Sequence, residues 1–287
     1  MRKTSVYLPD ALKRRLSAVA EAAHRSEADL VREAIEQRVA GVGSVEPVDR
    51  AVPGRLVGVG VGPGAPDLLT VRAVRALRRA TAVVAPCTDA AAVGRAEAIV
   101  REAAPDVVVE RLVFVMAPEP AGRTAALDAA GARVIELLDA GNEVAFVTLG
   151  DPNVYSTFSS IAVAVAAARP ATPVETVPGV MAFQDLASRA QVVLTDEQQS
   201  LVVLPANGAD EPLADALADL ARTIVLYKGG RRLPDVAAQL RDASRLDGAV
   251  LGELLGMPGE RIVAVADVAD RPAAYLSAVI VPAREGA

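Results

Sequence analysis

Short segments rich in glycine and proline follow several apolar stretches of this 287-residue sequence, and they are the first candidates for chemistry. One of them, GVGVGPGAPDLLT, begins at Gly58 and has the glycine content of a phosphate-binding loop. A dinucleotide-binding G-x-G-x-x-G would need its third glycine where Pro63 stands. Started at Gly60, the motif fits only in its looser form, and Pro63 and Pro66 remove two backbone N–H donors that a phosphate needs. No Gly-Lys-Ser/Thr follows, so we expect a loop that lines a pocket without holding phosphates.

Residues with nucleophilic or metal-binding side chains are scarce in this chain. It contains one histidine, His24, and one cysteine, Cys87. We interpret His24 as a surface turn residue within an N-terminal helical segment, and Cys87 as apolar filler at the end of a strand. A single cysteine excludes a disulfide framework within the chain. Because there is no histidine–cysteine cluster, we predict no metal site. No catalytic residue is assigned from the sequence.

The glycine turns lie at the ends of apolar segments that alternate with helical patterns. From Arg55 onward the order is strand, loop, helix and strand, and the theme repeats along the chain. Such alternation predicts an α/β fold, in which ligands bind outside the carboxyl ends of the strands. The strands are expected within RLVGVGVG, TAVVAP, NEVAFVTLG, VETV, SLVVLPA, TIVLYK, AVLGELLGMPGERI and YLSAVIVP.

The first forty residues follow a different pattern. RKTSVYLP alternates apolar and polar residues as a half-buried strand does, and a first helix opens at Asp10. Ser26, with Asp29 three residues further on, forms a variant capping box for a second helix, which ends at Gly41. One strand and two short helices cannot bury a core alone, so this segment is expected to dimerise.

This arrangement of strand, helix and capped helix resembles the ribbon-helix-helix family. In that family two chains pair their strands, and the ribbon enters the major groove of DNA. The resemblance implies that Lys3, Ser5 and Tyr7 face the bases and that the amides near Ser26 and Glu27 hold a phosphate. Residues 1–41 carry a net charge of only +2, against −8 for the remainder, which is weak for DNA binding. The alternative is therefore a unit that only dimerises the domains behind it.

Composition bounds the organisation of the chain. With 52% hydrophobic and 23% charged residues, it can bury a sizeable core and form two or three domains. We expect a unit over 1–41, a Gly/Pro/Ser linker over 42–54, and two α/β domains over 55–174 and 175–287. No signal-peptide pattern opens the chain, and no apolar run reaches the roughly 18 residues of a membrane span. We therefore expect a cytoplasmic protein without a membrane partner.

A set of ordered motifs resembles the tetrapyrrole (precorrin/corrin) methylases: GVGVGPGAPDLLTVRAVRAL, TLGDPNVYSTF, VPGV, YKGGRRLPDV, GMPGERI and YLSAVIV. The resemblance runs from Arg55 to Pro282 and implies two α/β domains, a tetrapyrrole substrate, and S-adenosyl-L-methionine bound in the cleft between the domains of a homodimer. This cofactor has no phosphates, which suits the loop after Gly58. Within the family, TLGDPNVYSTF and MPGERI look most like the enzymes that methylate precorrin-2 at C20 in cobalamin biosynthesis. The anaerobic counterparts of those enzymes act on cobalt-factor II.

The resemblance also implies site residues. Methyl transfer from a sulfonium is an in-line displacement that depends on positioning and needs no nucleophilic side chain. Asp151 is the strongest single candidate, because its carboxylate would meet the cationic end or the hydroxyls of the cofactor; a helix cap after the strand is the alternative. The implied cofactor-binding residues are Pro63, Gly150, Asp151, Tyr155, Ser156, Thr157, Met181, Ala182, Tyr227, Lys228 and Met257, with Gly62 and Gly64 beside the tetrapyrrole.

An acidic protein must supply local cations to a substrate that carries many carboxylates. The candidates are Arg95, Arg123, Lys228, Arg231 and Arg232, and for any one arginine the alternative is a solvated surface position. The chain departs from the family pattern at Met181 and Ala182, where small hydroxyl residues are usual, and at Leu254, where an arginine is usual. Two alternatives therefore stay open: a sister methylase acting on another tetrapyrrole, and a DNA-binding regulator with a methylase-like ligand sensor.

Overall fold

The computed structural model describes residues 10–41, 54–114 and 120–284, and the chain divides into two compact units, Met1–Ala51 and Val52–Ala287. The expected N-terminal strand, with Lys3, Ser5 and Tyr7, lies outside the described residues, as do residues 42–53 of the expected linker.

The N-terminal unit contains the two expected helices, α1 (Asp10–Ala22) and α2 (Glu27–Gly41). The predicted cap is present: the Asp29 N–H donates to Ser26 Oγ at 3.1 Å, and the Ser26 hydroxyl donates to Asp29 Oδ2 at 2.7 Å. His24 lies in the exposed turn between the helices with φ of 50°, as expected of a surface turn residue.

The second unit begins with a parallel five-stranded sheet of order β3-β2-β4-β1-β5. Helices α3 and α4 pack on one face of this sheet, and α5 and α6 pack on the other. Gly58 is required in β1, because a Cβ there would lie 2.6 Å from the ring of Phe158. The bounds are β1 Arg55–Gly60, α3 Val71–Arg79, β2 Ala82–Cys87, α4 Arg95–Ala103, β3 Val109–Val113, α5 Pro120–Asp139, β4 Glu143–Thr148, α6 Phe158–Ala168 and β5 Val174–Val177.

A second, mixed sheet of order β6-β7-β10-β8-β9 follows in the same unit. Helix α7 packs on one face, and α8 and α9 cover the other. The bounds are α7 Ala182–Ala190, β6 Ser200–Pro205, α8 Glu211–Leu217, β7 Arg222–Tyr227, α9 Leu233–Asp242, β8 Val250–Glu253, β9 Arg261–Ala264 and β10 Ser277–Val281, with short 3-10 turns at η1 Pro66–Leu68, η2 Gly230–Arg232 and η3 Val265–Val268.

The passage from the first sheet to the second lies later than the sequence indicated. A division between residues 174 and 175 would cut β5, which pairs in parallel with β1 from Leu56↔Val174 to Val59↔Val177. The next element, α7, packs its Leu186 and Ala187 against the second sheet. The structure therefore changes sheets between Val177 and Ala182.

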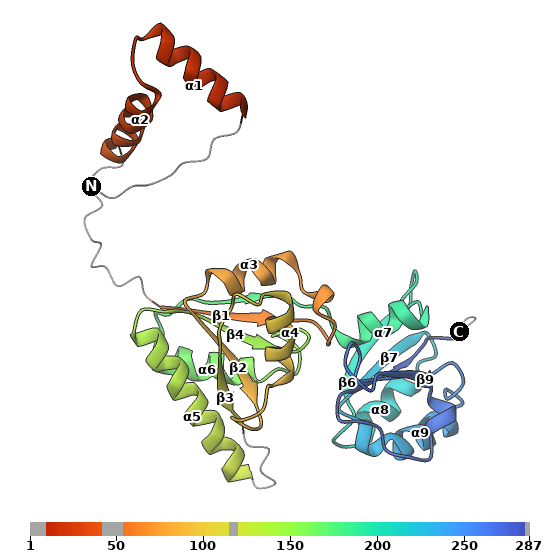
Figure 1. Ribbon diagram of the computed structural model, residues 1–287. Helices are drawn as coiled ribbons and strands as arrows, with labels where there is room; N and C mark the ends of the chain where they lie inside the picture. Colours follow the sequence, from red (N-terminus) through yellow and green to blue (C-terminus); the bar gives the residue numbers. More distant parts are fainter. Residues whose placement is uncertain (1–9, 42–53, 115–119, 285–287) are drawn as a thin grey trace. The chain divides into compact units, whose positions relative to one another are not determined.

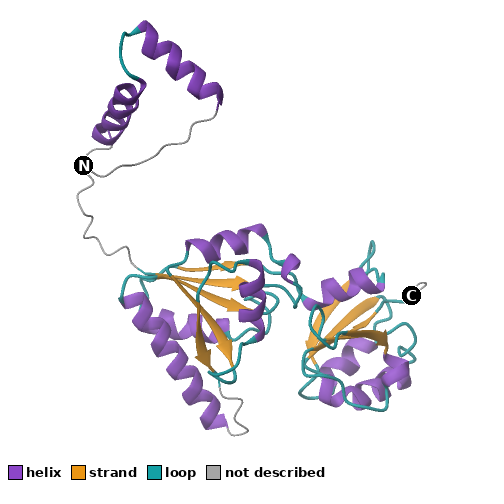
Figure 2. Cartoon of the chain, in the orientation of Figure 1, coloured by secondary structure: helices purple, strands orange, loops and turns teal. Residues whose placement is uncertain are grey.

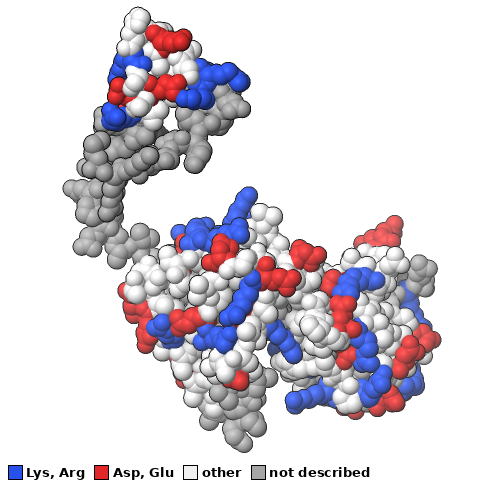
Figure 3. Space-filling model, viewed as in Figure 1, with Lys and Arg blue, Asp and Glu red and all other residues white. Residues whose placement is uncertain are grey.

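Charged side chains of both signs are interspersed on the surface, as Figure 3 shows for one face. Many of the arginines pair with acids, for example Arg133 with Glu110 and Arg78 with Asp106. Among the described residues, no helix is both long and apolar enough to cross a membrane. Cys87 is buried at the end of β2, as predicted.

Candidate functional site

A well-lined cavity of the second unit lies where β4 and the loop after β1 meet the ends of β7 and β10. Its volume is about 210 Å³, far above the roughly 10–15 Å³ that one water molecule needs. Ten of the eleven residues expected to bind a cofactor line it: Pro63, Gly150, Tyr155, Ser156, Thr157, Met181, Ala182, Tyr227, Lys228 and Met257.

Three glycines build the base of the cavity, where β1, β4 and β5 end. A Cβ on Gly60 would lie 2.5 Å from the Gly150 carbonyl oxygen, and a Cβ on Gly179 would lie 2.1 Å from the same atom. The Gly150 N–H also donates to the Gly62 carbonyl at 2.8 Å. The backbones of three distant segments thus touch directly, which places Pro63, Gly150 and the residues after Gly179 around one space.

The loop after β1 packs against the turn that follows β8. A Cβ on Gly64 would lie 1.9 Å from the Leu255 carbonyl oxygen, and a Cβ on Gly256 would lie 2.1 Å from the Ala65 nitrogen. The glycines of this loop therefore serve close backbone packing between the two sheets. This explains why a glycine-rich loop here has prolines where a phosphate cradle would need N–H donors.

An aromatic and cationic group forms one wall of the cavity. The Tyr155 and Tyr227 rings lie edge-to-face with centroids 6.3 Å apart, and the Lys228 ammonium lies 5.4 Å from the Tyr155 centroid. The Tyr155 hydroxyl donates to the Val203 carbonyl at 3.1 Å. These contacts fix two ring faces beside the space, suited to a planar ring or a cation.

Tyr227 connects this wall to the start of α7. Its hydroxyl accepts the Phe183 N–H at 3.1 Å, one of the helix N–H groups that have no partner within the helix. Burial raises the pKa of the Tyr227 hydroxyl to about 12, so it stays neutral in the folded protein at ordinary pH.

Three of the six described non-glycine residues with positive φ in the second unit line the cavity. These are Tyr155, Lys228 and Leu254, with φ angles of 50°, 60° and 49°. Residues other than glycine adopt such angles at a cost of order 1–3 kcal/mol, and they gather at functional sites. The strain fixes the direction of two side chains, Tyr155 and Lys228, toward the cavity.

The polar groups of the cavity are few. The Ser156 hydroxyl donates to Thr148 Oγ1 at 3.0 Å and accepts the Phe158 N–H at the start of α6. Lys228 is the only charged residue among those that line the cavity, and no carboxylate does so. No group of three or more metal-binding side chains occurs in the described part of the chain.

Asp151 does not line the cavity but links two of the loops that do. Its Oδ1 accepts the Asn153 N–H at 2.8 Å, and its Oδ2 accepts the Gly179 N–H at 3.1 Å. Both oxygens are thus engaged with the backbone, and the expected contact of this carboxylate with a cofactor stays a prediction. The carboxylate joins the turn after β4 to the loop after β5, and it does not cap α6, whose N-cap is Thr157.

The other predicted cations are dispersed. Arg95 lines a second cavity together with Gly64, and this cavity shares Leu254 and Met257 with the first. Arg232 is engaged with Asp210, whereas Arg231 is exposed and lines neither cavity. The side chain of Arg123 lies outside the described part of the structure.

Half of the residues that line the cavity were not predicted from the sequence. Tyr275, Leu276, Ser277 and Ala278 reach the cavity because β10 is antiparallel to β7, with Ala278 opposite Tyr227. The start of β10 therefore lies at the same edge as the end of β7. If the last strand had been predicted to pair antiparallel with β7, these four residues would have been placed at the cavity. The remaining unpredicted lining residues are Thr148, Leu149, Val154, Gly252, Leu254 and Leu255.

Residues 55–269 match the family model of the tetrapyrrole (corrin/porphyrin) methylases. The chain belongs to this family. Residues 2–40 match the model of ribbon-helix-helix proteins of the copG family. The tetrapyrrole methylase fold is also found among solved structures: a cobalt precorrin-4 methyltransferase aligns with a TM-score of 0.63 and 22% identity over 82% of this chain and 97% of that one.

Two curated relatives cover most of the tetrapyrrole methylase part. A precorrin-2 C(20)-methyltransferase of Sinorhizobium sp is 37% identical over 80% of this chain and 95% of its own length. A cobalt-precorrin-2 C(20)-methyltransferase of Salmonella typhimurium is 32% identical over 79% of this chain and 96% of its own length.

Proposed function

We propose that this protein is an S-adenosyl-L-methionine-dependent methyltransferase that methylates precorrin-2 at C20 in corrin biosynthesis. The observation that carries the proposal is the cavity at the strand ends, lined by ten residues that the family resemblance assigns to the cofactor. The relative from Sinorhizobium sp, 37% identical to this chain, supports the choice of substrate and carbon.

The donor set of the cavity fits this cofactor. Apolar side chains and two tyrosine rings suit the adenine ring and the methyl-bearing sulfonium, and the hydroxyls of Thr148, Ser156 and Ser277 suit ribose hydroxyls and an ammonium group. No arginine is among the described residues that line the space. The bound cofactor supplies an electrophilic methyl group.

The residues of the chain position the reacting groups. The reacting carbon has to be held about 3–3.5 Å from the methyl group, in line with the bond that breaks. The methyl group moves to C20, the bonding pair stays on sulfur, and a proton leaves the product. The glycine contacts at Gly60, Gly150 and Gly179 and the strained Tyr155 and Lys228 give the cavity a fixed shape for this step. The second cavity, with Arg95, is the place we assign to part of the carboxylate-bearing substrate.

The N-terminal unit is proposed to pair with a second copy of the chain, which makes the protein a homodimer in the cytoplasm. Leu12 and Val19 on α1 support this, because 47% and 55% of their surfaces are exposed and two helices cannot bury a core alone. The match to ribbon-helix-helix proteins supports a second function for this unit, DNA binding through Lys3, Ser5 and Tyr7. The second unit is proposed to consist of two α/β domains, one around each sheet.

The proposal is tested by incubating the full chain with S-adenosyl-L-methionine and either precorrin-2 or cobalt-factor II, and weighing the products. A gain of one methyl group on either tetrapyrrole supports the assignment and identifies the metal state of the substrate. If neither substrate gains a methyl group while the protein binds the cofactor, the C20 assignment is contradicted. A shift in DNA affinity on ligand binding, without turnover, would then favour the regulator.

A further inference from the structure

Lysine is used very sparingly in this protein. The chain has 27 arginines and three lysines, and Lys228 is the only lysine after residue 13. Elsewhere in the second unit, positive charge is supplied by arginine, and much of it pairs with acids at the surface. Because arginine is the default cation here, a single lysine at the wall of the main cavity suggests a requirement for a compact ammonium group.

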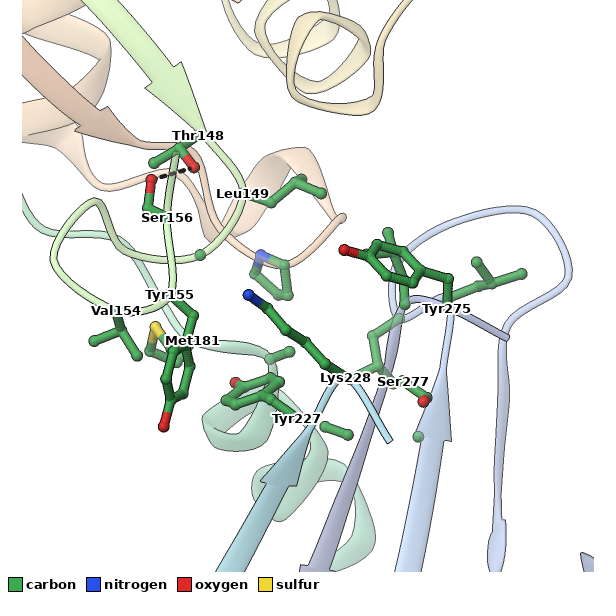
Figure 4. Close-up of a pocket in the computed structure, with 18 of the residues that line it drawn as sticks. Thr148, Leu149, Val154, Tyr155, Ser156, Met181, Tyr227, Lys228, Tyr275 and Ser277 are labelled. Carbon is green, nitrogen blue, oxygen red and sulfur yellow. Dashed lines mark hydrogen bonds between the residues drawn. The ribbon is translucent and has the colours of Figure 1, made fainter. Parts of the chain in front are cut away.

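The position of Lys228 is strained and fixed. Its φ angle is 60°, a conformation that favours glycine or asparagine. The next residue packs closely against the segment after β6, since a Cβ on Gly229 would lie 2.8 Å from the Ala206 Cβ. At the other side, the Tyr227 carbonyl accepts the Ala206 N–H at 2.7 Å. This backbone directs the side chain into the cavity, as Figure 4 shows.

The ammonium group of Lys228 has an aromatic neighbour and no carboxylate neighbour. It lies over the Tyr155 ring, and within the described residues no ion pair and no carboxylate of the cavity lining neutralises it. A lone ammonium would repel the sulfonium of the proposed cofactor, so it opposes binding unless the ligand brings a negative charge to it. The compensating group has to be an anion, and the cavity has no place built for phosphate.

We infer that Lys228 is the receptor for a carboxylate of the bound ligand. This inference rests on the proposed function, in which two carboxylate sources reach the cavity: the methionine end of the cofactor and the acid side chains of the tetrapyrrole. In the absence of ligand, the Tyr155 face holds the ammonium. When the carboxylate binds, a charge-assisted hydrogen bond replaces this contact.

The test compares Lys228→Met with wild type in calorimetric titrations using S-adenosyl-L-methionine, S-adenosylhomocysteine and decarboxylated S-adenosylmethionine. Lys228→Arg keeps the charge, and Arg241→Met removes an exposed arginine on α9 as a matched control. If the cofactor supplies the carboxylate, Lys228→Met weakens binding of the first two ligands about 10- to 100-fold and does not weaken binding of the decarboxylated ligand, whose sulfonium is no longer repelled by the ammonium. If the tetrapyrrole supplies it, cofactor binding is unchanged and KM for precorrin-2 rises by a similar factor.

Two results overturn the inference. One is unchanged affinity for all three cofactor ligands together with an unchanged KM. The other is an equal loss for the carboxylated and decarboxylated ligands, which would assign Lys228 a packing role. Failure of the wild-type protein to bind any of the three ligands contradicts the proposed function instead, so the two failures are distinguishable.

Discussion

Substituting alanine for Gly179 tests how the base of the cavity is built. The new Cβ would lie 2.1 Å from the Gly150 carbonyl oxygen and 2.8 Å from the Gly60 carbonyl carbon. Both neighbours are backbone atoms, so no flexible side chain can move aside. The loop after β5 therefore has to separate from the ends of β1 and β4, by roughly 1 Å to reach ordinary contact distance.

The expected effects follow from that displacement. Forcing an extra carbon into a packed site costs about 1–3 kcal/mol of stability. The Gly179 N–H would also move relative to Asp151 Oδ2, which now lies 3.1 Å away. Gly150 and Met181 both line the cavity, and a misplacement of about 1 Å at a reacting centre can reduce turnover about 100-fold.

The assay is thermal and urea unfolding, together with cofactor titration and turnover. Gly208→Ala is the matched control, since a Cβ there meets no atom within 4 Å, and Gly131→Ala is a second one, whose Cβ would lie 3.5 Å from Ala164 in ordinary contact. Both controls should retain wild-type cofactor affinity. If Gly179→Ala retains wild-type stability and affinity as well, the close backbone contact at the base of the cavity is not needed, and the reasoning is refuted.

Three further substitutions test buried polar contacts of the second unit by urea unfolding. Tyr227→Phe should lose about 1–3 kcal/mol at pH 7, because an N–H of α7 loses its acceptor. Since the pKa of Tyr227 is raised to about 12, wild-type stability should fall between pH 10 and 12 by up to about 2.7 kcal/mol more than the stability of the phenylalanine variant; parallel curves would contradict this. Glu97→Gln should lower the free energy of unfolding by about 3 kcal/mol at pH 7, because the fully buried carboxylate pairs with Arg111. The Arg111 side chain is 21% exposed, so water can partly replace the lost carboxylate. The Arg111 guanidinium lowers the pKa of Glu97. The stabilisation by this ion pair is therefore present above the unfolded pKa of about 4.3 and should diminish as the pH falls below it. A loss of stability in Glu97→Gln that does not depend on pH would count against the ion pair. Arg245→Met should lower the free energy of unfolding by at least about 3 kcal/mol, because the buried Arg245, 1% exposed, donates to three backbone carbonyls that would lose their partner. A loss under about 1 kcal/mol would show that water satisfies these carbonyls.

The sequence predicted the parts of the fold that carry strong local signals. Apolar stretches ending in glycine or proline turns became β1, β4 and β7, because a buried strand needs a continuous apolar run and a turn at its end. The shorter VETV before Pro178 became β5, an edge strand that is mostly exposed. The segment from Arg95 to Asp139 was not interpreted, and it forms α4, β3 and α5. Helix α5 is rich in alanine, which packs well but gives a weak apolar periodicity.

The site was predictable where it depends on a motif and not where it depends on pairing between distant segments. Ten residues that were predicted to bind a cofactor line the cavity, and their motifs each stand at one strand end. Tyr275 and Ser277 were missed because only the antiparallel pairing of β10 with β7 brings them to the cavity. The role of Asp151 was likewise hidden, because its partner, the Gly179 N–H, lies 28 residues away in the sequence.

The central claim is that this cavity places a methyl group on C20 of precorrin-2. The most direct measurement is the carbon NMR spectrum of the tetrapyrrole formed by the full chain from precorrin-2 and S-adenosylmethionine labelled with carbon-13 in its methyl group. The account predicts one enriched methyl resonance, with coupling or correlation to C20, and its loss in Gly179→Ala at matched enzyme concentration. Label at any other carbon, or no enriched methyl group in the wild-type reaction, would contradict it.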